Sequence, residues 1–291
     1  MKNRLKAFGY INLIVLIILI IMWVTVFFVQ GLPGAVSWGV LKLIIPFTGI
    51  PAILINIVLL IKNLLRKQTI SRRIAGVLVS GTAIFPILLT MNVLLLAYPA
   101  DITKVSPAVT VAWPFKEEAV IGFGGDRVED NLPHAVWASE RWAYDIVMEP
   151  YNTGSKETAS YGIWNKEVYS PVSGVVVEAY DEEEDIRANT EEFISSEGNH
   201  VYIRIASTGT YLLLNHLKKD SVALKTGDEV EAGDYIGRVG NSGSTSEPHL
   251  HIHHQRQDPT KMVLPVFAEG LPLYFEGIKD SMPVKDTIIT P

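Results

Sequence analysis

The chain has 291 residues, no cysteine, a formal net charge of −6 and a mean hydropathy of +0.24. Charged residues make up only 19% of it, below the roughly 25% of ordinary soluble proteins. The chain is too hydrophobic for disorder and has the wrong sign of charge for a nucleic-acid binder, so no nucleic-acid partner is expected. Without cysteine, disulfide frameworks and thiol catalysis are excluded, and any metal site must use histidine and carboxylate ligands.

Charge divides the chain near residue 100. Residues 1–100 contain nine Lys or Arg and no Asp or Glu, whereas the remainder has 16 basic residues and all 31 acidic ones. The two parts therefore carry formal charges of +9 and −15. Parts this different are suited to different solvents, and we predict a membrane anchor over residues 1–100 and a soluble domain over residues 101–291.

Three apolar runs fill the first part, at about residues 10–29, 43–61 and 74–98. Each is close to or above the roughly 18–20 residues that cross a bilayer core. The first run is too long for the apolar region of a signal peptide, which has about 7–15 residues. Pro46 and Pro51 interrupt the second run, but membrane helices tolerate proline. The sequence therefore predicts three transmembrane helices embedded in a lipid bilayer.

Basic residues predict the orientation of these helices. Lys2, Arg4 and Lys6 precede the first run, five Lys or Arg lie within residues 62–73, and the connection at residues 30–39 is uncharged. The positive-inside rule then places the N-terminus and the 62–73 loop in the cytoplasm. Three crossings put the C-terminal domain outside the cytoplasmic membrane, so we expect a multi-pass cell-membrane protein.

From about residue 106 the pattern changes to short β-branched and aromatic runs separated by Gly, Asn, Asp and Pro, which is typical of a β-rich domain. The predicted strands are residues 108–113, 142–147, 174–180, 200–206, 211–217, 235–239, 249–254 and 262–267.

All seven histidines lie in this second part, and four of them fall within residues 249–254. Alternate side chains of a strand share a face, so His249, His251 and His253 are predicted to point one way while Leu250 and Ile252 face the core. His254 should face away from the other three. Imidazoles at positions i and i+2 can together hold a metal and the water bound to it, so the pattern indicates a metal site.

The segment Gly240–His251, which ends in His-Leu-His after a Gly-Ser-rich turn, closely resembles the C-terminal signature of the lysostaphin/LytM-type zinc metallopeptidases. These are bacterial cell-wall endopeptidases with a duplicated hybrid motif. Asn215–Leu217 is similar to the family's second motif, and residues 170–174 and 222–239 resemble its strand-and-turn framework. The resemblance covers roughly residues 113–266 and implies an all-β, barrel-sandwich-like domain.

The family binds one zinc through a His and an Asp of one motif and the second His of the His-x-His motif, with water in the fourth position. Carried over by residue, the resemblance implies that His251 and Asp145 are zinc ligands. It also implies that His216 and His249 are the two catalytic histidines outside the ligand set. Which of these two acts as the base is left open by the sequence.

The first motif departs from the common HxxxD pattern, because the residue four positions before Asp145 is Arg141. A guanidinium has no free lone pair and cannot coordinate zinc. The nearest histidine is His134, in a segment that resembles the Asn-x-His of some family members. We therefore predict that His134 supplies the missing ligand from an adjacent strand or loop; the alternative is an ordinary loop histidine in a degenerate site.

Together these features indicate a membrane-anchored zinc metallo-endopeptidase that binds one Zn²⁺ per chain and hydrolyses amide bonds in peptidoglycan peptides by zinc-activated water. The loops at residues 151–161 and 181–196 are expected to flank its substrate groove. Because Arg141 stands where the common motif has histidine, an alternative interpretation is a catalytically impaired family member that binds cell wall or regulates another wall hydrolase. A peptidase acting on proteins is a further alternative. A biotinyl/lipoyl-like carrier is disfavoured, because no lysine lies in a tight hairpin between its two half-motifs.

Overall fold

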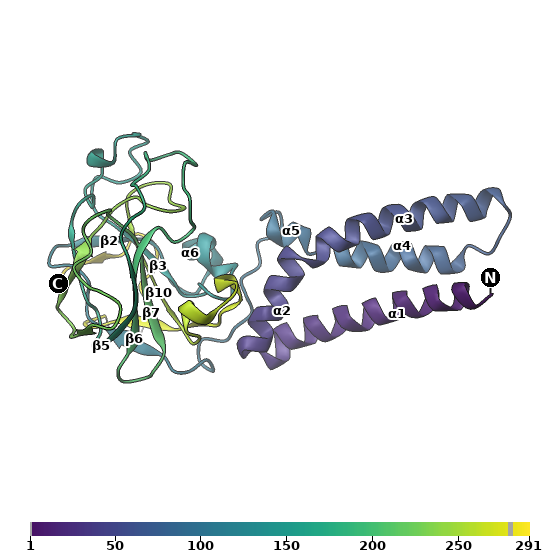
Figure 1. The fold of residues 1–291 in the computed structure, drawn as a ribbon, viewed down its shortest axis with the longest axis horizontal. Helices are drawn as coiled ribbons and strands as arrows, with labels where there is room; N and C mark the ends of the chain where they lie inside the picture. Colours follow the sequence, from purple (N-terminus) through teal and green to yellow (C-terminus); the bar gives the residue numbers. More distant parts are fainter. Residues whose placement is uncertain (1, 279–281) are drawn as a thin grey trace. The chain divides into compact units, whose positions relative to one another are not determined.

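The computed structural model describes residues 2–278 and 282–291, with side chains from residue 11 onward. The side chains of Lys2, Arg4 and Lys6, on which part of the predicted orientation rests, lie outside the described residues. The chain divides into two compact units, Met1–Pro99 and Ala100–Pro291, and each is described by itself (Figure 1).

The first unit is helical, with α3 and α4 side by side (Figure 1). Three segments, Ile11–Val29, Ile45–Leu65 and Ser71–Thr90, are long and apolar enough to cross a membrane, so the three predicted apolar helices are present. A helix suits such a segment because it satisfies every backbone polar group internally. The elements are α1 (Lys2–Val24), a π-helical turn (Thr25–Val29), α2 (Gly31–Leu43), α3 (Ile45–Leu65), α4 (Ser71–Ile84) and α5 (Ile87–Thr90).

Two parts of this unit differ from the prediction. The uncharged connection at residues 30–39 is not a loop but most of α2, and Pro33 is tolerated there because it lies in the first turn. The third apolar run was expected to continue to Tyr98, yet the helical conformation ends at Thr90. Pro86 lacks the N–H that would continue α4, so the helix breaks before it.

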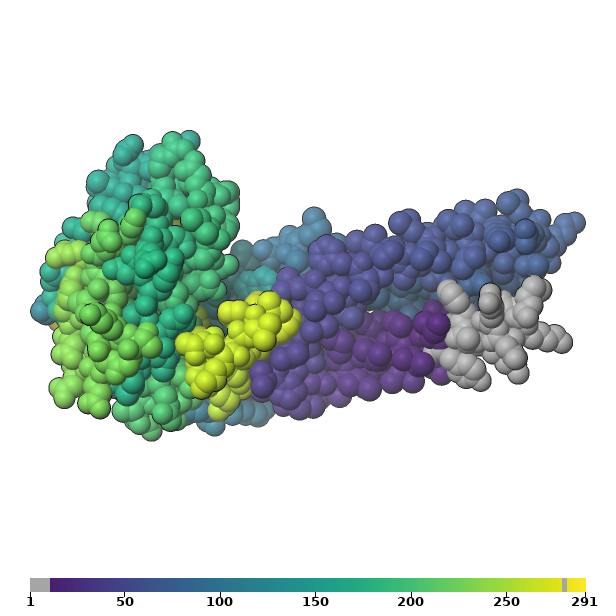
Figure 2. Space-filling model, viewed as in Figure 1, coloured from purple at the N-terminus to yellow at the C-terminus, as the bar shows by residue number. Residues whose placement is uncertain are grey.

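The second unit is β-rich, and Figure 2 shows one face of its surface in teal to yellow. Its large sheet has nine strands in the order β13-β2-β3-β10-β7-β6-β5-β8, with β11 paired to β10. Two small sheets pair β1 with β12 and β4 with β9. The strands are β1 (Val109–Val111), β2 (Ala119–Phe123), β3 (Tyr144–Val147), β4 (Glu167–Tyr169), β5 (Gly174–Tyr180), β6 (Asn199–Ile205), β7 (Tyr211–Leu217), β8 (Glu229–Val230), β9 (Tyr235–Arg238), β10 (Leu250–Gln255), β11 (Gly270–Leu271), β12 (Leu273–Phe275) and β13 (Ile288–Ile289).

Seven of the eight predicted strands are present, five of them with shifted ends, but the strand predicted at residues 262–267 is wrong. The 3₁₀ turn Pro265–Phe267 lies there, preceded by another at Pro259–Lys261, and each begins at a proline, which has no ladder N–H. The short strands β2, β4, β8, β11, β12 and β13, together with the helix α6 (Val128–Ala135), were not predicted. Most are too short to show a period of their own.

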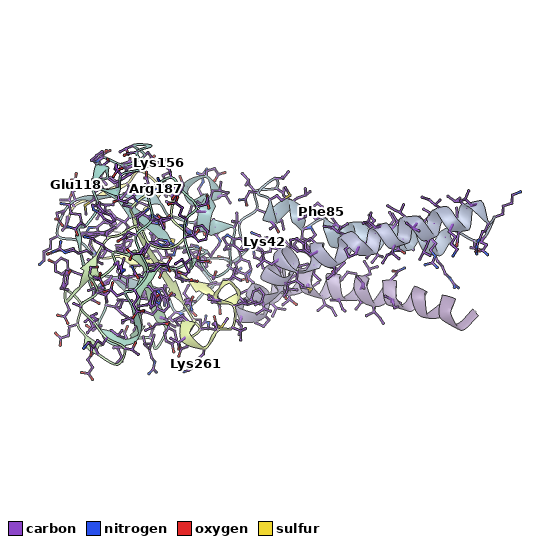
Figure 3. The ribbon with its side chains drawn as sticks, turned by 45° about the horizontal axis from the view of Figure 1, so that its top comes forward. Lys42, Phe85, Glu118, Lys156, Arg187 and Lys261 are labelled. Carbon is purple, nitrogen blue, oxygen red and sulfur yellow. The ribbon has the colours of Figure 1, made fainter. Side chains whose placement is uncertain are left out.

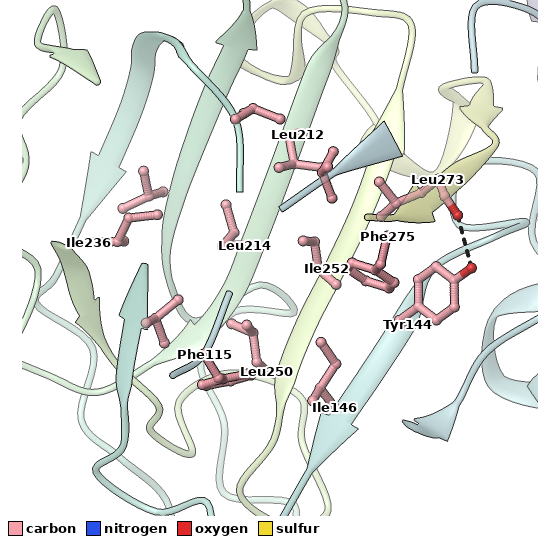
Figure 4. Packing of buried hydrophobic residues seen from close by; sticks show 14 of the residues in the cluster. Phe115, Tyr144, Ile146, Leu212, Leu214, Ile236, Leu250, Ile252, Leu273 and Phe275 are labelled. Atoms are coloured by element: carbon pink, nitrogen blue, oxygen red, sulfur yellow. Dashed lines mark hydrogen bonds between the residues drawn. The ribbon is translucent and has the colours of Figure 1, made fainter. Parts of the chain in front are cut away.

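One hydrophobic core joins the large sheet to both small sheets. Leu212 and Leu214 of β7 and Leu250 and Ile252 of β10 point into it, because alternate residues of a strand share a face (Figure 4). The Tyr144 hydroxyl, buried in the same core, donates a hydrogen bond to the Leu273 carbonyl at 2.9 Å. This packing holds the central strands β3, β10 and β7 in fixed positions, and these strands carry the candidate site.

The loops expected to flank a groove are tied to each other. Lys156 and Arg187, labelled in Figure 3, come from these two loops, and the Ala188 N–H donates to the Lys156 carbonyl at 3.2 Å. The Asn189 side-chain amide adds hydrogen bonds to the Ser155 carbonyl at 2.9 Å and the Tyr161 hydroxyl at 3.0 Å. The two loops therefore form one connected surface feature.

Candidate metal centre

The centre begins with a row of side chains across three adjacent strands. In the antiparallel pairings of β10, His251 lies opposite Asp145 of β3 on one side and opposite Asn215 of β7 on the other. Directly opposed residues of a sheet project to the same face. The row Asp145–His251–Asn215 is therefore set by strand register, and all three side chains are buried.

Asp145 is the centre of the polar cluster. One carboxylate oxygen, Oδ1, lies 3.0 Å from His251 Nδ1 and 3.4 Å from His249 Nε2. The other, Oδ2, lies 3.0 Å from His134 Nε2. A carboxylate thus sits between three imidazoles from two separate regions of the sequence.

His134 reaches Asp145 from α6, which corrects the prediction of a strand or loop. Glu140 lies on the far side of the ring, with its Oε2 at 3.4 Å from His134 Nδ1. A carboxylate on the second nitrogen of a ligating histidine is the usual way to fix such a ring. Arg141 takes no part in the cluster, because its guanidinium pairs with Asp126 at 2.8 Å.

His216 enters the site through a β-bulge. Between Asn199/Leu217 and Val201/Leu214, the pairing of β6 with β7 opposes one residue, His200, to two, Asn215 and His216, and His216 has a left-handed φ of 63°. Regular alternation would have placed His216 on the face of Leu214, in the core. The extra residue returns its ring to the face of Asn215, and bulges re-aim side chains in this way next to functional sites.

The rings of His216 and His249 lie together, with centroids 4.7 Å apart. Each has its Nδ1 close to a backbone carbonyl, that of Ser242 for His216 and that of Glu247 for His249, both at 2.8 Å. A carbonyl only accepts, so both Nδ1 atoms carry hydrogen and donate. The Nε2 atoms are then left as lone-pair nitrogens when the rings are neutral.

Alternation along residues 249–254 predicts that His253 shares the face of His251, although it is not among the expected ligands or catalytic residues. His253 belongs to a directional chain of hydrogen bonds. His251 Nε2 lies 2.9 Å from His253 Nδ1, His253 Nε2 lies 3.2 Å from Gln255 Oε1, and the Gln255 amide donates to the Gln257 carbonyl at 2.7 Å. All donors of this chain point toward the Gln257 carbonyl: His253 Nε2–H donates to Gln255 Oε1, and His251 Nε2–H donates to His253 Nδ1. The lone pair of His251 Nδ1 therefore faces Asp145.

The remaining histidines lie outside this cluster. His254 faces the other side of β10, where it lies 2.6 Å from the Thr210 hydroxyl and 3.1 Å from the Pro272 carbonyl. His200 is stacked on Tyr202, with ring centroids 4.2 Å apart. The sequence also gave no signal for Glu140, whose position depends on how α6 meets β3.

The electrostatics of the cluster favour a cation beside Asp145. Burial lowers the pKa of His134, but the carboxylates of Asp145 and Glu140 outweigh it and raise the pKa to about 10. Burial raises the pKa of Asp145, yet the imidazoles of His134 and His249 hold it well below its usual range. His216 is different, because burial and the neighbouring rings of His249 and His251 hold its pKa well below 6.5.

Two overlapping sets of side chains could hold a metal: His134, Asp145 and His251, or His216, His249 and His251, each with ligand atoms within 4.8 Å of one another. The first set has the two-His, one-carboxylate composition of catalytic zinc sites. Its His134 Nε2 is buried and makes no hydrogen bond of acceptable geometry, although it faces Asp145. An orphaned nitrogen aimed at a carboxylate fits a metal between them, so these residues suit zinc.

A cleft of about 530 Å³ opens onto the cluster. His134, Asp145, His216, His249 and His251 all line it. The structure therefore brings together every residue that the sequence singled out for metal binding or catalysis, and it gives them a common opening.

Residues 157–262 match peptidase family M23. The match spans His216, His249 and His251 and begins after His134 and Asp145, so the variant first motif lies outside it. It confirms the predicted resemblance to the lysostaphin/LytM-type peptidases over this part of the β-rich unit. No curated protein matches the chain.

Solved structures similar to the chain include three peptidases. Lysostaphin from Staphylococcus simulans is 18% identical over 59% of this chain and 52% of its own, with a TM-score of 0.31. A putative peptidase M23 from Pseudomonas aeruginosa is 18% identical over 56% and 54%, and a zinc-containing peptidase from Vibrio cholerae is 20% identical over 54% and 41%, both with TM-scores of 0.31. The chain spans about half the length of these proteins or less, and likenesses of this size do not by themselves define a function.

Proposed function

We propose that this protein is a membrane-anchored zinc metallo-endopeptidase that hydrolyses amide bonds in peptidoglycan peptides. The observation that carries the proposal is the arrangement around Asp145: His134 Nε2 and His251 Nδ1 each lie 3.0 Å from one of its two oxygens. Two neutral imidazoles and one carboxylate leave a bound Zn²⁺ with net positive charge. Zinc in such a site lowers the pKa of water to about 7 and polarises a carbonyl.

His216 and His249 are assigned the proton transfers of amide hydrolysis, which needs a base for the attacking water and an acid for the leaving amine. Their Nδ1 hydrogens are held by the Ser242 and Glu247 carbonyls, so each ring keeps Nε2 for the reaction. The lowered pKa of His216 keeps that ring neutral and able to accept a proton at Nε2. Protonated, either ring can donate a hydrogen bond to a developing oxyanion.

The first unit is proposed as the anchor over residues 1–100, and residues 101–291 as the extracytoplasmic peptidase domain. The three apolar helices support membrane attachment. The cluster of basic residues in the 62–73 loop and the uncharged segment at residues 30–39 support the orientation. In that orientation the metal centre faces the compartment in which peptidoglycan lies.

The proposal is tested by zinc content and by digestion of purified sacculi, using the full chain in detergent. We expect one zinc per wild-type chain and release of peptides, with both lost in His251→Ala and His134→Ala. Arg141→Lys is the matched control, because Arg141 pairs with Asp126 rather than with the cluster. This variant should keep its zinc.

Other results would change the proposal in defined ways. Retention of stoichiometric zinc by His134→Ala would indicate that the metal is bound by His216, His249 and His251 instead. A wild-type chain without zinc or cleavage would favour the catalytically impaired family member. Cleavage of a protein such as casein but not of sacculi would mean that the substrate is a protein and not peptidoglycan.

A further inference from the structure

The cleft above the metal centre continues into a second hollow of about 500 Å³ along the same face of the sheet. Trp137, Glu140, Glu197 and Asn215 line both hollows, so the two form one groove. A peptide whose scissile bond lies at the cluster must extend through one or other end of this groove. The second hollow is therefore positioned to bind a side chain close to the reacting bond.

The second hollow carries negative charge. Glu140, Glu178 and Glu197 line it, and none of its described lining residues is Lys or Arg. Glu140 is engaged by His134, whereas Glu178 lies only near His200, at 3.9 Å from its Nε2. An anionic group entering here would be repelled by uncompensated carboxylates.

Two buried acceptors in the same hollow have no donor. His200 is 9% exposed, and its Nδ1 lies 2.7 Å from the Gly198 carbonyl and therefore donates, which leaves Nε2 as an acceptor without a partner. Asn215 is 5% exposed, and its Oδ1 is also unpartnered. A buried acceptor left unsatisfied costs free energy, and a donor that binds there accounts for both of these acceptors at once.

The His200 ring cannot turn easily to find another partner. It is stacked between Tyr180 and Tyr202, with centroid distances of 5.7 and 4.2 Å and interplanar angles of 29° and 14°. Burial lowers the pKa of His200, which keeps the ring neutral and Nε2 unprotonated. The Glu178 carboxylate and His200 Nε2 thus form two acceptors 3.9 Å apart, a spacing that one nitrogen with several N–H donors can bridge.

We propose that this hollow is a subsite for a primary ammonium group on a substrate side chain, held by Glu178, His200 and Asn215 beside the metal centre. The ammonium has three donors, which can hydrogen-bond to the unpaired acceptors, and a positive charge, which can pair with the carboxylates. A carboxylate or phosphate on the substrate would be repelled by the glutamates of the hollow. An apolar side chain would leave the two acceptors without a donor. The inference rests on the proposed peptidase function and names its substrates as peptides that carry a free side-chain amine.

The test compares lysine-containing muropeptides with a free ε-amine and the same muropeptides after Nε-acetylation. Binding is measured by calorimetry on the zinc-loaded full chain with His249→Gln, so that bound peptide is not turned over. We expect acetylation to weaken binding at least 10-fold. Adding Glu178→Gln should reduce this preference to less than 3-fold. Glu231→Gln removes the same charge from an exposed residue that lines neither hollow and should keep the full preference.

Equal binding of the two muropeptides would overturn the subsite, whatever the activity of the protein. A preference that survives Glu178→Gln, His200→Phe and Asn215→Leu would overturn its assignment to these residues. Sacculus digestion by the chain with His249 intact separates the two proposals: a preserved amine preference without any cleavage would contradict the peptidase and leave the subsite standing.

Discussion

The two faces of strand β10 have opposite chemistry. One face presents His251, His253 and Gln255, which are linked by hydrogen bonds, and the Nδ1 atom of His251 lies next to Asp145. The other presents Leu250 and Ile252, which are fully buried in the hydrophobic core, and His254, which is satisfied by Thr210 and Pro272. All of these side chains are buried, so burial alone does not distinguish a core position from a site position.

The two faces differ instead in the kind of atoms that their side chains contact. The apolar residues of the core face end on apolar atoms, and His254 ends on Thr210 and Pro272, whereas the polar groups of the site face form one connected series. Substitutions one residue apart on β10 should therefore separate chemistry from stability.

On the site face, His251→Ala should lower the rate of sacculus digestion by about 10³-fold or more, because it removes a proposed metal ligand and with it several kcal/mol of transition-state stabilisation. The free energy of unfolding of the metal-free chain should change little by comparison. Urea unfolding in detergent with a chelator, followed by near-ultraviolet circular dichroism, checks the second point. A large loss of stability would mean that His251 is mainly a packing residue.

On the core face, Ile252→Ala should lower the free energy of unfolding by about 2–5 kcal/mol, since it leaves a cavity among Leu214, Leu250 and Phe275. The folded protein should keep one zinc per chain. The same urea titration measures the loss, and metal analysis of the folded fraction measures the zinc. Loss of zinc from folded Ile252→Ala would show that the two faces are not separable.

His254 is expected to make the free energy of unfolding depend on pH, although it takes no part in the proposed chemistry. Burial lowers its pKa to about 4, so below pH 6.5 the unfolded chain binds a proton that the folded chain does not. Its contribution is complete above pH 6.5 and is lost between pH 6.5 and about 4, at most about 3 kcal/mol. The stability difference between the wild type and His254→Asn, both metal-free, should therefore shrink by that amount as the pH falls. A difference that does not depend on pH contradicts this account.

His253→Phe should weaken zinc binding by about 10–100-fold, the usual effect of removing a group that orients a metal ligand. The His251 Nε2–H then loses the acceptor that fixes which nitrogen faces Asp145. Competition with a chromophoric chelator measures the affinity. His253→Gln, which restores an acceptor, should recover part of the loss, whereas His254→Asn should leave the affinity unchanged. Failure of His253→Gln to recover any affinity would point to packing instead.

The sequence was sufficient where one short segment carries the whole signal. The composition of the first 100 residues predicted three apolar helices, and the alternation of residues 249–254 predicted which side chains of β10 face the core. It failed where a second segment decides the outcome. Alternation along β7 gives His216 the core face, and only the bulge formed against β6 turns it to the site.

The composition and motifs by themselves determined the family resemblance, the apolar helices and the absence of thiolate ligands, because these depend on residue types and local spacing. Only the tertiary structure decided how the departure at Arg141 is resolved, since that depends on the packing of α6 against β3. There Arg141 turns to Asp126 and His134 turns to Asp145, with Glu140 behind it. The proposed amine subsite also depends on the tertiary structure, because its acceptors come from β5, β6 and β7 and lie together only when the sheet has formed.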